Sequence, residues 1–272
     1  MLVRGDLCTG CGLCEPYCPV GAITIGGVAV IDQDRCVECA ICHRSGICPV
    51  DALELPSLTW PRLVRALFSD PLLAHPGTGV LGRGTEEMKT NDVTGRFQPG
   101  QVGVGIELGR PGMGTSFGDV EVMATRLAAL GIRFEPDNPV TQLMVDDAGH
   151  LRPDVLGERA LSAIIEFTVP QDRLLPVLAA VREAGARIET VFSLDIIVPD
   201  PARHAEEVAR LCREAGFPVR PNGKTNVGLG HRRAAWVGGP GGVGSGTGGG
   251  AGGAAAGRGT GTGPVGGEEG TR

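Results

Sequence analysis

The sequence is poor in aromatic residues and has no long hydrophobic run. Aromatic side chains make up only 4% of the 272 residues, so we expect a core built mainly from aliphatic side chains. No apolar run approaches the ~20 residues that a membrane-spanning helix needs. The first residues, MLVRGDLCTGC, lack the apolar region of a secretory signal. These absences predict a cytoplasmic protein without a membrane span.

Signatures of catalysis and of nucleic-acid binding are also missing. There is no Walker A loop, no HExxH and no dinucleotide fingerprint between a strand and a helix. The formal net charge is −6, and residues 1–55 hold three arginines against seven acidic residues, a net charge of −4. Nucleic-acid binding needs clustered lysine and arginine, so this charge argues against it. With no catalytic residue identified, the sequence favours a protein that is not itself an enzyme.

The cysteines, in contrast, are concentrated near the N-terminus. Eight of the nine lie in two runs, each with three cysteines separated by two residues and each closed by a Cys-Pro pair. The first run is Cys8, Cys11, Cys14 and Cys18, and the second is Cys36, Cys39, Cys42 and Cys48. Three thiolates at this spacing can converge on one iron–sulfur cubane. Zinc sites usually take cysteines in pairs from two knuckles, and a disulfide framework is typical of secreted proteins.

Residues 1–55 resemble a bacterial-type ferredoxin with two [4Fe–4S] clusters. The segments CPVGAITI and CPVDALEL, which begin at the last cysteine of each run, show an internal duplication. Residues 22–25 and 28–31 flank Gly26 and Gly27 and predict a hairpin with a two-glycine turn. The resemblance implies that three cysteines of each run share a cluster with the last cysteine of the other run. One cluster would take Cys8, Cys11, Cys14 and Cys48, and the other would take Cys36, Cys39, Cys42 and Cys18. Five residues separate Cys42 from Cys48, whereas this family usually has three between the corresponding cysteines. The longer gap bears on the loop geometry of the cluster that Cys48 would bind.

The resemblance implies an electron-transfer protein that passes single electrons to or from a partner oxidoreductase. The acidic charge of residues 1–55 favours docking to a basic patch on that partner, although an acidic face that only keeps the protein soluble would look the same. Two alternatives stay open. The protein could be a redox- or ligand-sensing regulator, or an electron-transfer subunit of an oxidoreductase complex.

The rest of the chain predicts an α+β organisation. Residues 56–99 read as a connector with a short helix at 61–68 and a polar run at 83–96, which is either an anion-binding loop or a solvated surface loop. Residues 100–237 show strand, helix, strand, strand, helix and strand, followed by an extra helix and an edge strand at 224–229. This order predicts a ferredoxin-like (βαββαβ) sandwich, with a weak resemblance to ACT domains that bind small ligands. The second of these strands is expected at 140–145, and Ser116 and Asp200 are expected to cap the first helix and the extra helix at their N-termini.

A glycine-rich loop between the first strand and helix of this domain is a candidate ligand site. Its residues are Arg110, Gly112, Gly114, Thr115 and Ser116. We expect free N–H groups and a partial positive charge at the helix start, which would suit a small anionic molecule. The turn alone explains the glycines equally well. Outside the two runs, Cys212 is expected to be a small buried side chain, and His43 a bystander beside the cysteine loops.

Residues 238–272 are predicted to be a disordered tail, because eighteen of these 35 residues are glycine and no apolar burial would offset the entropy of ordering them. Removing the tail should therefore leave the fold and the iron content unchanged. The check compares melting temperature and iron per chain for the full-length and truncated proteins. A large drop in melting temperature would show that the tail is docked.

Overall fold

The computed structural model of the protein describes residues 1–82, 98, 100–110 and 112–220. Three expected features lie outside the described residues: the polar run 83–96, the edge strand 224–229 and the tail 238–272. The described part of the chain mixes helices and strands. None of the helices in that part is long and apolar enough to cross a membrane.

The N-terminal segment contains two small antiparallel sheets. β1 (Leu2–Val3) pairs with β4 (Leu53–Glu54), which brings the two ends of the segment together. β2 (Ile23–Ile25) pairs with β3 (Ala29–Ile31), as the hairpin pattern predicts. The connection between β2 and β3 spans three residues, 26–28, rather than two glycines alone.

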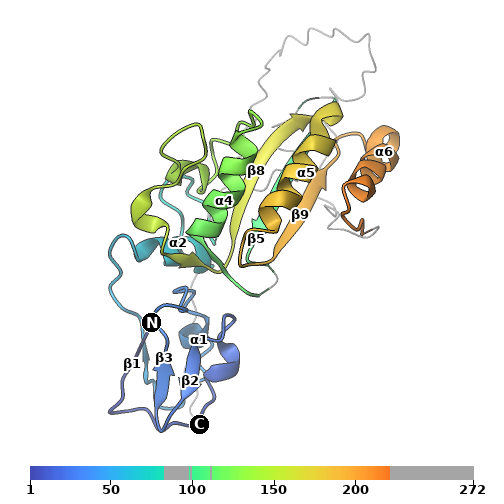
Figure 1. Ribbon diagram of the computed structural model, residues 1–272. Coiled ribbons are helices and arrows are strands. Elements are labelled where there is room, and N and C mark those ends of the chain that lie inside the picture. The colour runs from blue at the N-terminus through green and yellow to red at the C-terminus, as the bar shows by residue number, and fades with distance from the viewer. Residues whose placement is uncertain (83–97, 99, 111, 221–272) are drawn as a thin grey trace, which may run out of the picture. The chain divides into compact units, whose positions relative to one another are not determined.

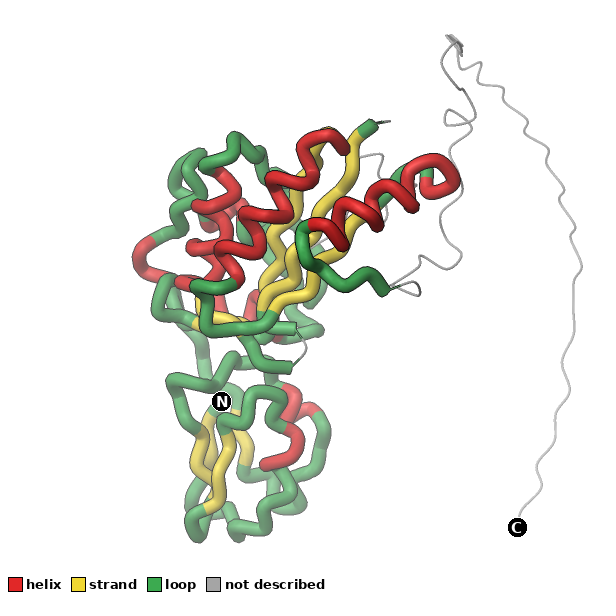
Figure 2. Tube along the Cα trace, turned by 45° about the vertical axis from the view of Figure 1, so that its right-hand side comes forward, coloured by secondary structure: helices red, strands yellow, loops and turns green. Residues whose placement is uncertain are grey.

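The second part of the chain is built on a three-stranded antiparallel sheet. β5 (Gln101–Leu108) lies in the centre, between β8 (Ala163–Pro170) and β9 (Phe192–Ile197). The helices α4 (Phe117–Ala128) and α5 (Leu174–Gly185) contact each other and lie on one face of this sheet (Figure 1 and Figure 2). A one-turn 3-10 helix, η5 (Gln171–Arg173), leads into α5.

Alternating apolar residues explain which face of β5 meets the helices. Successive side chains of a strand point to opposite faces, and every second residue of β5 is fully buried. These residues are Val102, Val104, Ile106 and Leu108. They share one core with Phe117 and Leu127 of α4 and with Leu178 of α5, so aliphatic side chains dominate the core, as the composition predicts.

The strand expected at 140–145 is wrong. This stretch contains a 3-10 helix, η3 (Thr141–Leu143), because Asn138 starts a turn: its Oδ1 accepts a hydrogen bond from the Val140 N–H at 2.8 Å. The position beside β8 is taken instead by Phe134, which forms a single antiparallel bridge with Phe167. The sheet of the described residues therefore has three full strands and one bridging residue at its edge.

The two predicted N-caps behave differently. Ser116 caps α4, since its Oγ accepts a hydrogen bond from the Asp119 N–H at 3.0 Å. The last described helix, α6 (Pro201–Glu214), begins after Asp200, but the Asp200 side chain makes no cap bond to it, contrary to expectation. Cys212 is buried on α6, which confirms it as a small buried side chain.

The helix expected at 61–68 forms as α2 (Leu63–Ser69). Its apolar residues Val64, Leu67 and Phe68 belong to the same core as β5 and α4. The ring of Phe68 meets that of Phe117 edge-on, with 5.0 Å between their centroids. At its end, the Ser69 hydroxyl accepts a hydrogen bond from the Leu161 N–H at 2.8 Å. This helix is thus packed into the α+β core.

Replacing Phe68 with alanine should lower the free energy of unfolding by about 3–5 kcal/mol, because it leaves a cavity in this core. Denaturant unfolding followed by circular dichroism measures the change. Leu72, which follows α2 and is 66% exposed, supplies the control: Leu72→Ala should change stability by no more than about 0.5 kcal/mol. Equal effects of the two substitutions would contradict the placement of α2.

Candidate functional site

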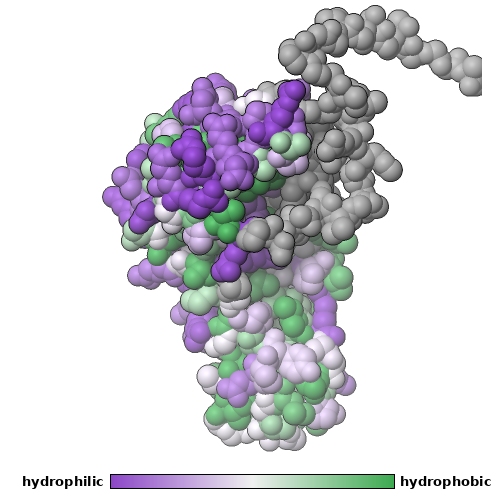
Figure 3. Space-filling model, turned by 90° about the vertical axis from the view of Figure 1, so that its right-hand side faces the viewer, coloured by the Kyte–Doolittle hydropathy of each residue, from purple (hydrophilic) through white to green (hydrophobic). Residues whose placement is uncertain are grey.

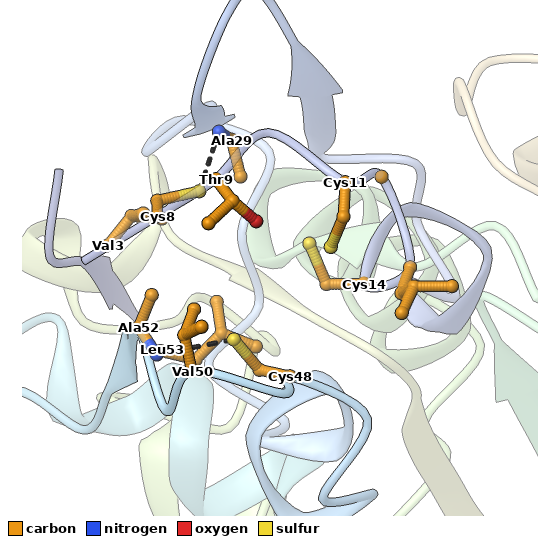
Figure 4. Close-up of a pocket in the computed structure, with 12 residues that line it drawn as sticks. Val3, Cys8, Thr9, Cys11, Cys14, Ala29, Cys48, Val50, Ala52 and Leu53 are labelled. Atoms are coloured by element: carbon orange, nitrogen blue, oxygen red, sulfur yellow. Dashed lines mark hydrogen bonds between the residues drawn. The ribbon is translucent and has the colours of Figure 1, made fainter.

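Two pockets in the N-terminal segment are each lined by four cysteines. The first pocket takes Cys8, Cys11 and Cys14 from the first run and Cys48 from the second. Figure 4 shows their sulfur atoms turned towards one space. Cys48 reaches this place because β4, a few residues later, pairs with β1 just ahead of Cys8.

The second pocket has the reciprocal composition. Cys36, Cys39 and Cys42 line it together with Cys18, the last cysteine of the first run. The longer gap between Cys42 and Cys48 is accommodated within the loop itself. The helix α1 (Ile41–Arg44) extends past Cys42, and Gly46 then turns the chain with φ +63°. The short helix η1 (Glu15–Tyr17) occupies the corresponding gap of the first run.

The two pockets differ in their exposure to solvent. In the first pocket Cys11 is exposed, and Cys8 and Cys48 are half-buried. In the second pocket three cysteines are buried and only Cys18 is half-buried; the buried ones are Cys36, Cys39 and Cys42. Figure 3 shows many pale and green residues on the visible surface of the N-terminal segment. Leu7 and Leu13, which flank cysteines of the first run, are among its exposed apolar residues.

Backbone N–H groups point at the last cysteine of each run. Ala22 N–H donates to Cys18 Sγ at 3.1 Å, and Ala52 N–H donates to Cys48 Sγ at 3.2 Å. A third such bond runs from Ala29 N–H to Cys8 Sγ at 3.3 Å and lowers the pKa of that thiol. Hydrogen bonds of this kind stabilise negative charge on sulfur.

Burial acts in the opposite direction on the second pocket. It raises the pKa of the Cys36 and Cys39 thiols and raises that of Cys42 to about 12. Metal ligation needs thiolates, so binding at this pocket must displace protons from the buried cysteines.

The two runs share a backbone conformation as well as a cysteine spacing. Gly10 and Gly12 of the first run have positive φ, and so do Glu38 and Ala40 at the same places in the second run. A Cβ atom at Gly10 would lie 2.1 Å from the carbonyl oxygen of Gly27, so only glycine fits there. The second run carries ordinary side chains in the left-handed region, a costly conformation that surrounding contacts must hold.

Buried charges surround the second run, and the sequence interpretation missed them. Glu38 is buried and pairs with the N-terminal ammonium and with Arg62, whose Nη2 lies 2.6 Å from Glu38 Oε1. Arg65 is also buried and bonds to backbone carbonyls of this run. Their spacing of three residues in PRLVRALF places both arginines on one helix face, which is the signal that could have found them.

His43 lies beside lining residues of both pockets without lining either pocket itself. Its Nδ1 lies 3.1 Å from the carbonyl oxygen of Leu53. Across residues 1–82, 98, 100–110 and 112–220, no three His, Cys, Asp or Glu side chains are close enough to hold one metal ion together. Around a cubane each thiolate binds its own iron, so the four sulfur atoms lie further apart than around a single ion.

The glycine-rich loop does not offer the free N–H groups expected of it. At the start of α4, the Phe117 N–H donates to Glu158 O at 3.0 Å and the Gly118 N–H to Leu156 O at 3.1 Å. The Met113 and Gly114 N–H groups both donate to Gly109 O. The physical basis of the predicted anion site is therefore wrong for these N–H groups.

The side chains of the loop are placed as follows. Thr115 and Ser116 form β6, which pairs with β7 (Arg159–Ala160) and buries Thr115 completely. Arg110 reaches back to Glu107, with 3.4 Å between Nη1 and Oε2, and Gly112 is exposed. Ligand binding by Arg110, Gly112 and their neighbours stays a prediction.

Comparison with known proteins gives matches to iron–sulfur proteins. Residues 2–24 match the model of a family described as a 4Fe-4S binding domain. A ferredoxin-like protein in vnf region from Azotobacter chroococcum mcd 1 is 49% identical over 55 residues, which are 19% of this chain and 85% of that protein. Ferredoxin-2 of Chlorobaculum tepidum is 45% identical over 53 residues, 18% of this chain and 86% of that protein.

A protein named as part of a larger assembly matches over a similar length. This subunit of an ion-translocating oxidoreductase complex from Methanosarcina acetivorans is 47% identical over 49 residues, 18% of each chain. No solved structure gives a significant match. The matches cover the segment that contains the two cysteine pockets, and they identify the protein as an iron–sulfur electron-transfer protein that binds [4Fe–4S] clusters. Through this N-terminal segment, the chain belongs to the [4Fe–4S] ferredoxin family.

Proposed function

We propose that the protein carries two [4Fe–4S] clusters and passes single electrons to or from a partner oxidoreductase. One cluster is held by Cys8, Cys11, Cys14 and Cys48, and the other by Cys36, Cys39, Cys42 and Cys18. The observation that carries the proposal is the composition of the two pockets, because each collects three cysteines of one run and the last cysteine of the other. Such clusters take up and release one electron at a time.

The chain's own groups prepare each pocket for that chemistry. The Ala29 and Ala52 N–H groups would stabilise negative charge on sulfur in the first pocket, and the Ala22 N–H in the second. Apolar side chains, among them those of Met1, Ile23 and Ile31, help to line the second pocket. The exposure of Cys11 leaves one side of the first pocket open to a docking partner.

The iron content tests the two-cluster count. Anaerobically prepared protein should contain about eight irons per chain together with labile sulfide, and its broad visible absorbance should bleach with dithionite. Cys212→Ser, which removes a thiol far from both runs in sequence, should leave the count unchanged. Zinc without labile sulfide would contradict the proposal.

A single substitution tests the exchange of cysteines between the runs. Cys48→Ala should remove the same cluster as Cys11→Ala, although Cys48 is closer in sequence to Cys39. The measurement is the set of hyperfine-shifted cysteine β-proton signals in NMR spectra, with Cys39→Ala as the matched comparison. If Cys48→Ala instead reproduced the spectrum of Cys39→Ala, the cysteine assignment would be wrong.

A second candidate function is that of an electron-transfer subunit. It is favoured by the bonds that tie the second cysteine run to the α+β part, which a free carrier does not need. We propose that this part is a ferredoxin-like sandwich whose second strand is reduced to the bridge at Phe134.

Tagged protein isolated anaerobically distinguishes the two candidate functions, the free electron carrier and the electron-transfer subunit. A subunit would elute with a stoichiometric partner on gel filtration, whereas a carrier would elute alone.

A further inference from the structure

Arg65 is a buried cation that connects the second cysteine run to the α+β part. It lies on α2 and is only 5% exposed. Its Nη1 donates to the carbonyl oxygen of Cys36 at 2.7 Å and to that of Gln33 at 2.9 Å. A third, longer bond reaches Asp34 O at 3.2 Å. Its Nε pairs with the carboxylate of Glu158.

Glu158 lies in the α+β part of the chain, far in sequence from the second cysteine run. It follows the 3-10 helix η4 (Pro153–Val155) and directly precedes β7. Its backbone carbonyl accepts the Phe117 N–H that begins α4. One residue thus balances the charge of Arg65 and also anchors the start of α4.

We propose that Arg65 is a positioning residue that sets the reduction potential of the second cluster, and that Glu158 moderates its effect. The proposal rests on the proposed function, since it concerns the cluster held by Cys36, Cys39, Cys42 and Cys18. It extends that function by placing the electrostatic control of the buried cluster in the α+β part of the chain.

The sign of the effect follows from the charge of each group. A cluster gains one negative charge on reduction, so a nearby cation stabilises the reduced form and raises the potential. Guanidinium groups stay protonated in proteins, so this charge is permanent. Because Arg65 is buried, water screens it less than a surface charge. The Glu158 carboxylate acts against it.

Two other arginines near this pocket are paired with carboxylates. Glu38 is paired with the N-terminal ammonium and with Arg62. Arg44 pairs through both nitrogens with Asp70, with 2.6 Å between Nη2 and Oδ2. Arg65 is distinguished from these by its direct bond to the carbonyl of a proposed cluster ligand, Cys36.

The test uses the full-length, cluster-loaded protein and an EPR-monitored redox titration resolved into two one-electron steps. Arg65→Met should make the second cluster harder to reduce, by about tenfold in the reduced-to-oxidised ratio at fixed potential, or ~59 mV for one electron. Glu158→Gln should shift the same step in the opposite direction. NMR signals of the Cys36 β-protons assign the step that moves.

Two further variants separate charge from structure. Arg65→Lys keeps the cation and should stay nearer to the wild-type potential than Arg65→Met does. Arg4→Met removes an equivalent charge from an exposed arginine that pairs with Asp6, and should leave the second cluster's potential unchanged. A purely structural role predicts that Arg65→Met and Glu158→Gln, which break the same ion pair, act in the same direction.

Same-direction shifts, or no shift in either variant with full iron content, would overturn the role of Arg65. The proposed function fails separately, in the unmodified protein, if that protein lacks labile sulfide or does not show two one-electron steps. If Arg65→Met fails to load iron, Glu158→Gln and Arg65→Lys still decide the sign.

Discussion

The exchange of the last cysteine between the two runs is the constraint on which the N-terminal segment depends. Cys18 lies in the pocket of the second run and Cys48 in that of the first, so neither pocket is complete without the whole segment. This small segment buries little apolar surface, and metal–sulfur bonds are expected to supply much of its stability. The pairing of β1 with β4 and the β2–β3 hairpin serve mainly to place cysteines.

Patterns with a local physical cause could be predicted from the sequence. The cysteine spacing, the alternation along β5 and the Ser116 cap each depend on residues close in the chain, and each is present in the structure. The strand predicted at 140–145 was wrong. Its apolar residues are typical of a strand, but the Asn138 side chain accepts a hydrogen bond that holds the backbone in a turn. The predicted free N–H groups of α4 are occupied by Glu158 and Leu156, which lie about forty residues away in sequence.

Arg65 shows why contacts between distant parts of the chain could not be predicted from sequence patterns. A sequence pattern indicates that its helix is amphipathic, but not that the polar edge of the helix lies against the carbonyls of residues 33–36. The apolar side of α2 enters the α+β core while Arg62 and Arg65 bond to the cysteine-rich segment. A stretch that reads as a connector therefore contributes contacts on two sides at once.

The unequal exposure of the two pockets has a consequence for the protein's sensitivity to oxygen. Dissolved oxygen and peroxide attack iron–sulfur centres where they can reach them, and in the proposed assignment Cys11 leaves the first centre open whereas the second has three buried ligands. Damage on exposure to air should then be sequential rather than simultaneous. If both clusters are present as proposed, the first is lost before the second, and a partly degraded preparation would keep the cluster beside Arg65.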